Sequence, residues 1–187
     1  MVVEHRTRLG NSDCLRQNPY NSVMHVGHKN GCVTMWSPNM QKPLVSMLCQ
    51  KGSVQSLAVD RSGHYMVTSG SEGCVNVWDV RTYKQLYSYR TSRPASSIDI
   101  SQSGLIAMGF GSHVQTWKDM FTTEQELPYV VHELSGPVVR VSVARLYLVN
   151  WLSKDHCSAG CVFLSFPRCA WNLAFKGFFE HRCSRIR

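Results

Sequence analysis

The sequence predicts an all-β fold made of a repeated antiparallel unit, and three tryptophans carry most of this prediction. Trp36, Trp78 and Trp117 recur at steps of about forty residues. Each closes a phrase that opens at a glycine and contains a polar turn, and the phrases span residues 27–36, 70–78 and 109–117. Helical periodicity is not persuasive anywhere in the sequence, so strands are expected to account for its regular structure.

Each phrase has the pattern of a β-hairpin. A short apolar stretch precedes each turn, at residues 23–26, 65–68 and 105–108. Gly31 and Gly73 lie in the turns, where a hairpin needs the positive φ that glycine tolerates. In the strand that follows, Trp78 falls on one face and Val75 and Val77 fall on the other, which is the alternation of a β-strand.

The period indicates the kind of repeat. A step of about forty residues that ends in a Trp-Asp pair, here Trp78-Asp79, is typical of the blades of a WD-repeat β-propeller. We therefore expect Trp36, Trp78 and Trp117 at equivalent positions of successive four-stranded blades. The alternative, an antiparallel sandwich, leaves the constant spacing from turn to tryptophan as a coincidence. Further strands are expected at residues 43–48, 53–59, 85–89 and 95–100, and residues 135–143 are a candidate for the start of a fourth blade.

The length limits the number of blades. At roughly 40–45 residues a blade, 187 residues provide three to four, fewer than most WD propellers need to close a ring. The sequence therefore predicts a partial propeller that is a fragment of a larger ring. Strand edges near Val23 and after Val143 are then expected to stay unpaired or to be covered only by the tail. The isolated chain is therefore expected to aggregate, bind chaperones or oligomerise.

Composition divides the chain into two predicted segments. Residues 1–139, the partial WD-repeat propeller, carry 12 Lys/Arg and 10 Asp/Glu, whereas residues 140–187 carry 8 Lys/Arg and 2 Asp/Glu. The second segment also contains four of the eight cysteines and no further phrase that runs from glycine to tryptophan. We interpret residues 140–187 as a basic, Cys/aromatic-rich, irregular tail, of the kind that an alternative exon or read-through produces.

Three functional interpretations of the tail compete with that reading. Basic and aromatic side chains together are typical of nucleic-acid binding through phosphate contacts and stacking. Zinc binding is a second interpretation, although the Cys157-x₃-Cys161 pair has no matching second pair. The candidate zinc ligands are His156, Cys157, Cys161, Cys169, His181 and Cys183. A membrane span is not expected, because Pro167 and Arg168 interrupt the apolar run at residues 161–175, which is shorter than the ~20 residues required.

The sequence offers no recognisable active site. Histidines such as His25 and His64 have no serine or cysteine nucleophile at a recognisable triad spacing. No Gly-x₄-Gly-Lys phosphate loop occurs either. We expect no catalysis, no cofactor, no metal and no small-molecule substrate. Cys32 and Cys74 share one blade position and are interpreted as reduced strand residues of an intracellular protein, because the N-terminus has no signal-peptide pattern.

A longer pattern is more specific than the repeat. It includes residues 17–28 (QNPYNSVMHVGH), 30–31 (NG), 36–40 (WSPNM), 58–60 (AVD) and 68–70 (TSG). With further matches up to Gly136-Pro137-Val138, this pattern resembles the nucleolar WD-repeat-containing protein 46 family over about residues 5–138. The resemblance is lost beyond Val138, which is why residues 140–187 are interpreted as non-family sequence.

The resemblance implies a function. Members of that family are components of the small-subunit processome and support early processing of the 18S ribosomal RNA precursor. The expected role is a non-catalytic scaffold in the nucleus and nucleolus, with other processome proteins and pre-ribosomal RNA as partners and no membrane contact. The family's propeller has more blades, and its C-terminal extension is expected to be absent here. The candidate partner-contacting residues are Asn18, Tyr20, His28 and Arg81.

Two alternative functions stay open. Trp78-Asp79-Val80-Arg81 matches the Trp-Asp-x-Arg box of propellers that serve as substrate receptors of cullin-type ubiquitin ligases. In such receptors, the arginine at the position of Arg81 meets an adaptor. The same four residues also fit a strand end followed by a salt-bridging turn. A generic protein-interaction propeller of another pathway is the second alternative, and co-purification separates these functions.

Overall fold

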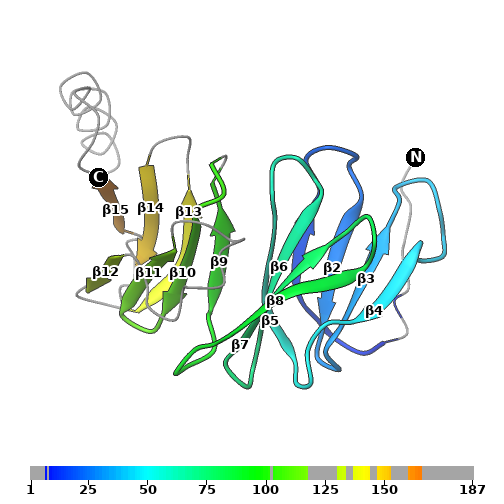
Figure 1. Ribbon diagram of the computed structural model, residues 1–187, viewed down its shortest axis with the longest axis horizontal. Helices are drawn as coiled ribbons and strands as arrows, with labels where there is room; N and C mark the ends of the chain where they lie inside the picture. The colour runs from blue at the N-terminus through cyan, green and yellow to red at the C-terminus, as the bar shows by residue number, and fades with distance from the viewer. Residues whose placement is uncertain are drawn as a thin grey trace, which may run out of the picture.

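The computed structural model describes residues 7, 9–101, 103–117, 130–133, 137–143, 147–152 and 160–165. Within these ranges the regular structure is fifteen β-strands in four antiparallel sheets, with no helix. Figure 1 shows the sheets side by side, with β1 to β4 toward one end of the molecule and β13 to β15 toward the other. The all-β prediction is confirmed.

Three sheets have four strands, each paired with its neighbour in sequence, and we call them blades 1 to 3. Blade 1 contains β1 (Ser12–Gln17), β2 (Met24–His28), β3 (Cys32–Trp36) and β4 (Val45–Leu48). Blade 2 contains β5 (Val54–Val59), β6 (Tyr65–Gly70), β7 (Cys74–Asp79) and β8 (Lys84–Arg90). Blade 3 contains β9 (Ser97–Ile100), β10 (Ile106–Phe110), β11 (His113–Trp117) and β12 (Val130–Glu133). The fourth sheet contains β13 (Val138–Val143), β14 (Tyr147–Leu152) and β15 (Gly160–Ser165).

The sheets are joined through their first strands. β1 packs against β5, β5 against β9, and β9 against β13. Side-chain hydroxyls tie these strands together: Ser56 Oγ accepts from the Ile98 amide at 2.9 Å, and Ser97 Oγ accepts from the Val141 amide at 3.0 Å. A row of neighbouring first strands is the arrangement around the centre of a propeller, so each sheet is one blade.

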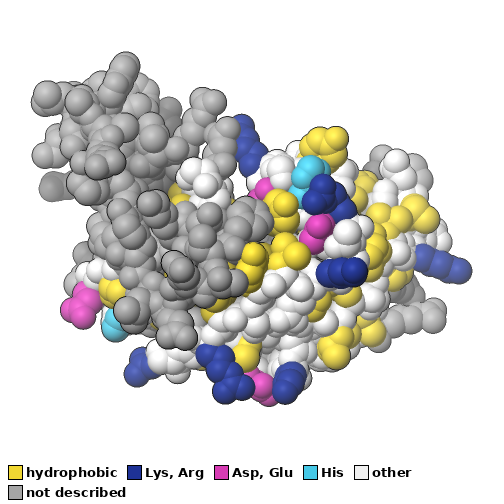
Figure 2. Space-filling view, viewed as in Figure 1, with side chains coloured by type: hydrophobic (Ala, Val, Ile, Leu, Met, Phe, Trp, Pro, Cys, Tyr) yellow, Lys and Arg dark blue, Asp and Glu magenta, His cyan; other side chains and the backbone are white. Residues whose placement is uncertain are grey.

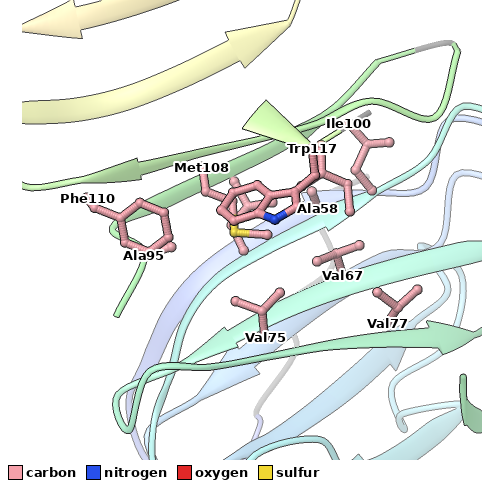
Figure 3. Packing of buried hydrophobic residues seen from close by; sticks show 11 residues of the cluster. Ala58, Val67, Val75, Val77, Ala95, Ile100, Met108, Phe110 and Trp117 are labelled. Carbon is pink, nitrogen blue, oxygen red and sulfur yellow. The ribbon is translucent and has the colours of Figure 1, made fainter. Parts of the chain in front are cut away.

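Apolar side chains fill the spaces between the blades. Between blades 2 and 3, Val75 and Val77 of β7 lie in one cluster with Met108, Phe110 and Trp117 of blade 3 (Figure 3). The cluster between blades 1 and 2 contains Val33, Met35, Cys49, Val54, Leu57, Met66 and Trp78. A smaller one between blade 3 and the fourth sheet contains Ala107, Val114, Val138 and Val141. Trp78 and Val77 thus face opposite blades, as the alternation predicts.

The hairpin turns use glycine where the sequence predicts it. Gly31 has a φ of 83° and Gly73 a φ of 75°, in the left-handed region that a side chain disfavours. A Cβ on Gly31 would also collide with the carbonyl oxygen of Gln50, so a side chain at this position would require the backbone to shift. These glycines therefore set both the turn conformation and the close approach of the next loop.

Two expectations about strands are wrong. The edge near Val23 is not unpaired, because β1 pairs with β2 through Leu15 opposite Val26. β1 is largely polar and half exposed, so it lacks the apolar alternation that reveals a strand in sequence. The tail is not irregular throughout, since β14 pairs with both β13 and β15. The strands expected at residues 43–48, 53–59, 85–89, 95–100 and 135–143 correspond to β4, β5, β8, β9 and β13.

Candidate functional site

Two of the three repeat tryptophans, Trp36 and Trp78, donate hydrogen bonds to buried threonine hydroxyls. In blade 2, Nε1 of Trp78 donates to Oγ1 of Thr68 at 3.2 Å, and the amide nitrogen of Gln50 donates to the same oxygen at 3.0 Å. Gln50 also donates to the Thr68 carbonyl at 3.0 Å. Since Gln50 precedes blade 2 and Trp78 lies on its third strand, this buried network fixes the loop between blades to the blade itself.

Blade 1 has a related network with a histidine in it. Nε1 of Trp36 donates to Oγ1 of Thr34 at 2.8 Å, and Nε2 of His28 lies 2.7 Å from the same oxygen. All three side chains are buried. Trp36, Trp78 and Trp117 each lie on the third strand of their blade, with Asp79 directly after Trp78. The sequence pattern indicates no role for Gln50 or Thr68, because a polar residue in a loop or strand carries no signal of its partner.

One face of the blades carries the β1–β2, β3–β4, β5–β6 and β7–β8 loops, and we call it the Tyr20 face. Tyr20 is 74% exposed there, and its ring centroid lies 6.0 Å from that of His64. Figure 2 shows hydrophobic, histidine and charged side chains mixed over the upper loops of blades 1 and 2, which belong to this face. Aromatic residues and arginine are enriched at protein-binding surfaces.

Arg81 lies on the Tyr20 face, where its guanidinium is held by a neighbour. Its Nη2 lies 3.2 Å from Oδ2 of Asp79 and its Nε 3.3 Å from Oδ1, while the Arg81 amide donates to Oδ1 at 2.8 Å. Hydrogen bonding to Arg81 lowers the pKa of Asp79, and the same contact raises the pKa of Arg81. The Trp-Asp-x-Arg box therefore forms the salt-bridging turn, although the Arg81 side chain stays 56% exposed.

Two of the predicted contact residues, Asn18 and His28, do not lie at the surface. Both side chains are fully buried, so neither can touch a partner. Asn18 donates to the Gly63 carbonyl at 3.0 Å and accepts from the Tyr20 amide at 2.9 Å, which links the β1–β2 loop to blade 2. His28 is the last residue of β2, and its Nε2 lies 2.7 Å from Oγ1 of Thr34. Of the four candidates, the structure brings only Tyr20 and Arg81 together at the surface.

A cavity of about 260 Å³ opens between blades 1 and 2 on the Tyr20 face. Its lining residues are Tyr20, Asn21, Val23, His25, Met35, Leu44, Val45, Gly63, His64, Val80, Arg81 and Tyr83. His25 is fully buried, its Nδ1 lies 3.4 Å from the Met66 sulfur, and its Nε2 has no hydrogen-bond partner among the residues that the structure describes. Burial lowers the pKa of His25 to about 4, so the ring is neutral at physiological pH.

A second cavity of about 210 Å³ lies at the first strands. Its charged lining consists of Arg16, Asp99 and Arg140. Arg16 Nε donates to the Leu57 carbonyl at 3.2 Å, and Asp99 accepts from the Val143 amide at 2.6 Å. Arg16 and Asp99 therefore help to connect neighbouring blades.

Reactive groups are few in the described part of the chain. Burial raises the pKa of Cys14 to about 11 and that of Cys49 to about 12, so both thiols stay protonated and weakly nucleophilic at neutral pH. Those cysteines, like Cys32 and Cys74, form no disulfide. Among the described residues, no three His, Cys, Asp or Glu side chains gather as a metal site requires. The candidate ligands His156, Cys157, Cys169, His181 and Cys183 lie outside the described residues.

The described ranges also contain no helix of the length and apolar character that crossing a membrane requires.

Sequence relatives point to one family. The chain is 47% identical over 120 residues to U3 small nucleolar RNA-associated protein 7 of Saccharomyces cerevisiae, which aligns 64% of this chain with 22% of that protein. It is 41% identical over 142 residues to WD repeat-containing protein 46 of Homo sapiens, covering 74% of this chain and 23% of the relative. The protein of the same name from Caenorhabditis elegans is 39% identical over 137 residues, covering 73% and 24%. The chain belongs to the WD repeat-containing protein 46 family. It spans less than a quarter of the length of these relatives, and no family model matches it.

Solved structures establish the same fold for this member of the WD repeat-containing protein 46 family. A structure titled "Structure of U3-55K" superposes with a TM-score of 0.71 at 14% identity, covering 83% of this chain and 49% of that one. The crystal structure of the RRP9 WD40 repeats gives a TM-score of 0.68 at 13% identity, with coverages of 82% and 51%. At such low identity these neighbours show the WD40 propeller fold alone.

Proposed function

We propose that this chain acts as a non-catalytic scaffold in ribosome biogenesis, as part of the small-subunit processome. The observation that carries the proposal is the identity of 47% to U3 small nucleolar RNA-associated protein 7 and of 39–41% to proteins named WD repeat-containing protein 46. In this role the chain works in the nucleolus, where it holds processome proteins and pre-ribosomal RNA together during processing of the 18S precursor.

The chemistry of the described residues supports a scaffold. Buried side chains such as Thr68 and Gln50 make hydrogen bonds that hold strands and loops together. The cysteine thiols of Cys14 and Cys49 stay protonated at neutral pH. Exposed side chains such as Tyr20 provide contact area on one face. A face of this kind serves to bind partners, and in the proposed role any catalysis is carried out by those partners.

We propose the same two segments that the composition indicates, a partial propeller at residues 1–139 and a tail of separate origin at residues 140–187. The charge difference between the two supports this division. β13, which spans Val138–Val143, would then carry the junction.

Depletion of the protein in cells tests the proposed function. The expected result is a rise in unprocessed 18S precursor, with the precursor RNA co-purifying with the tagged protein. Unchanged precursor levels together with stabilisation of some other protein would favour a ubiquitin-ligase receptor instead. The control is the depleted strain that re-expresses the wild-type protein, in which the precursor should return to its normal level.

A further inference from the structure

One of the residues that line the cavity between blades 1 and 2 has a ring nitrogen with no hydrogen-bond partner in the described part of the protein. His25 lies on β2 opposite Met35 of β3, on the side of blade 1 that packs against blade 2. The ring is fully buried, yet it lines the cavity. Buried nitrogen atoms are nearly always hydrogen-bonded. Nε2 of His25 has no such partner among the described residues, and unlike His28, whose Nδ1 is also unpartnered there, His25 lines a cavity that a guest can enter.

The atom next to Nδ1 of His25 determines whether Nε2 is a hydrogen-bond donor or acceptor. Nδ1 of His25 lies 3.4 Å from the sulfur of Met66. A thioether has no hydrogen to donate, so this contact is a hydrogen bond only when Nδ1 carries the proton. The neutral ring then presents the Nε2 lone pair as an acceptor. A guest in this cavity must therefore supply a hydrogen-bond donor.

The walls of the cavity determine the shape of the guest. They are mostly apolar, with Val23, Met35, Val45 and Val80 inside and Leu44, Tyr20 and Tyr83 at the rim. Leu44 is 46% exposed and Tyr83 49% exposed, so the cavity is open to solvent at these residues. The volume of about 260 Å³ is smaller than that of a usual drug-sized pocket, and suits one large side chain.

We propose that this cavity binds a tyrosine side chain of a partner protein, whose phenol ring packs between the apolar walls and whose hydroxyl donates to Nε2 of His25. Tyrosine combines a flat apolar body with a donor at its far end, as the cavity requires. The site is a partner-binding site on the Tyr20 face. The proposal does not depend on the pathway to which the partner belongs.

Charge at the rim favours a protein guest over RNA. Arg81 is the one Lys or Arg among the described lining residues, and Asp79 neutralises it through two hydrogen bonds. RNA binding depends on several Lys and Arg side chains that remain available to phosphates. The cavity therefore has little phosphate attraction, and its aliphatic lining suits a protein side chain.

A matched pair of small probes tests the proposal on the full chain. N-acetyl-L-tyrosinamide and N-acetyl-L-phenylalaninamide differ by the hydroxyl alone. In protein with ¹⁵N-labelled histidine, the tyrosine probe should shift the Nε2 resonance of His25. The His28 resonances should stay in place, because that ring binds Thr34 at the other end of β2. The phenylalanine probe should bind about three- to tenfold more weakly, which is the usual effect of one net hydrogen bond.

Two exposed leucines provide matched variants. Leu44→Glu places a carboxylate on the cavity wall and should weaken the tyrosine probe at least tenfold. Leu48→Glu changes a side chain that is 66% exposed and does not line the cavity, so binding should be unchanged. Equal shifts of His25 and His28, equal affinity for both probes, or equal loss in both variants would overturn the proposal. It would also be overturned if a single-stranded RNA oligonucleotide displaced the tyrosine probe and shifted His25 in its place.

Discussion

The indole N–H of Trp78 on β7 and the hydroxyl of Thr68 on β6 form a 3.2 Å hydrogen bond inside blade 2. The amide of Gln50 donates to the same hydroxyl oxygen at 3.0 Å. The ring of Trp78 meanwhile packs in the cluster between blades 1 and 2. One side chain thus connects a blade to the loop before it and to the neighbouring blade, so its loss should affect the whole propeller.

Replacement of Trp78 by alanine should lower the free energy of unfolding by about 3–5 kcal/mol, the usual loss for a large buried aromatic side chain. Trp78→Phe keeps most of the packing and loses the hydrogen bond, so it should cost about 1 kcal/mol. Urea denaturation midpoints of the three proteins measure both effects. A midpoint for Trp78→Ala equal to that of the wild type would show that the indole does not stabilise the core.

Stability should fall as the pH is lowered, because His25 is buried in its neutral form. Its pKa in the folded protein is about 4, below the ordinary histidine value of 6.5. Between these values the unfolded chain binds the proton and the folded chain does not, so acid favours unfolding. The penalty vanishes as the pH rises past 6.5, where both states are neutral. Going from pH 7 to pH 5 should remove about 2 kcal/mol of stability through this residue.

Urea midpoints at pH 7 and pH 5 measure this loss, and His25→Gln is the control because glutamine does not titrate. The variant should lose less stability over this range than the wild type. The pKa of His28 is also lowered by burial, so some dependence on pH should persist in the variant. Identical pH profiles for the two proteins would show that His25 is not the group responsible.

Arg81 should be dispensable for folding and for the proposed scaffold role. Its guanidinium contacts Asp79 two residues away and remains 56% exposed. Exposed ion pairs of this kind contribute little to stability, because water and salt screen them. Arg81→Ala should therefore leave the urea midpoint and the co-purification of 18S precursor unchanged. Loss of one specific protein partner in the variant, with RNA co-purification intact, would support the ligase-receptor alternative.

The sequence predicts the blades well where the pattern repeats and poorly where it does not. The spacing from Gly73 to Trp78 is the same as that from Gly31 to Trp36, so the amino-acid pattern alone is enough to predict blade 2. β1 escapes prediction because Ser12–Gln17 is mostly polar and its pairing with β2 leaves alternate side chains exposed. In a propeller, the first strand of each blade lines the central channel, so some of its side chains can be polar. β14 and β15 lack the repeat phrase, and strand pairing alone defines them.

The contact surface is harder to predict than the fold, because burial depends on distant residues. Asn18 and Tyr20 are two residues apart in the same loop, yet Asn18 is fully buried and Tyr20 is 74% exposed. The difference arises from Gly63, forty-five residues away, whose carbonyl accepts from Asn18. His25 has no local signal either, since its significance lies in the contact with Met66 and in an unpartnered nitrogen.

The packing of β13 against blade 3 gives a direct test of whether the sequence after residue 137 belongs to the propeller. A Cβ on Gly109 of β10 would lie 2.7 Å from Cγ1 of Val138 and 3.1 Å from Cγ2 of Val141. Gly109→Ala should therefore destabilise the protein by about 1–3 kcal/mol through overpacking. In a Val138→Ala background the added methyl group has room, so the same substitution should cost less.

The double-mutant cycle over Gly109 and Val138 isolates this contact, because each single variant is measured with the other position unchanged. Urea midpoints of the four proteins should give a coupling energy of about 0.5–3 kcal/mol, the range for residues in contact. Such coupling would mean that β13 is part of the folded core, and that a junction at residues 139–140 falls inside a packed strand. Additive effects would mean that β13 does not pack on Gly109 in solution, and would favour a tail that begins before Val138.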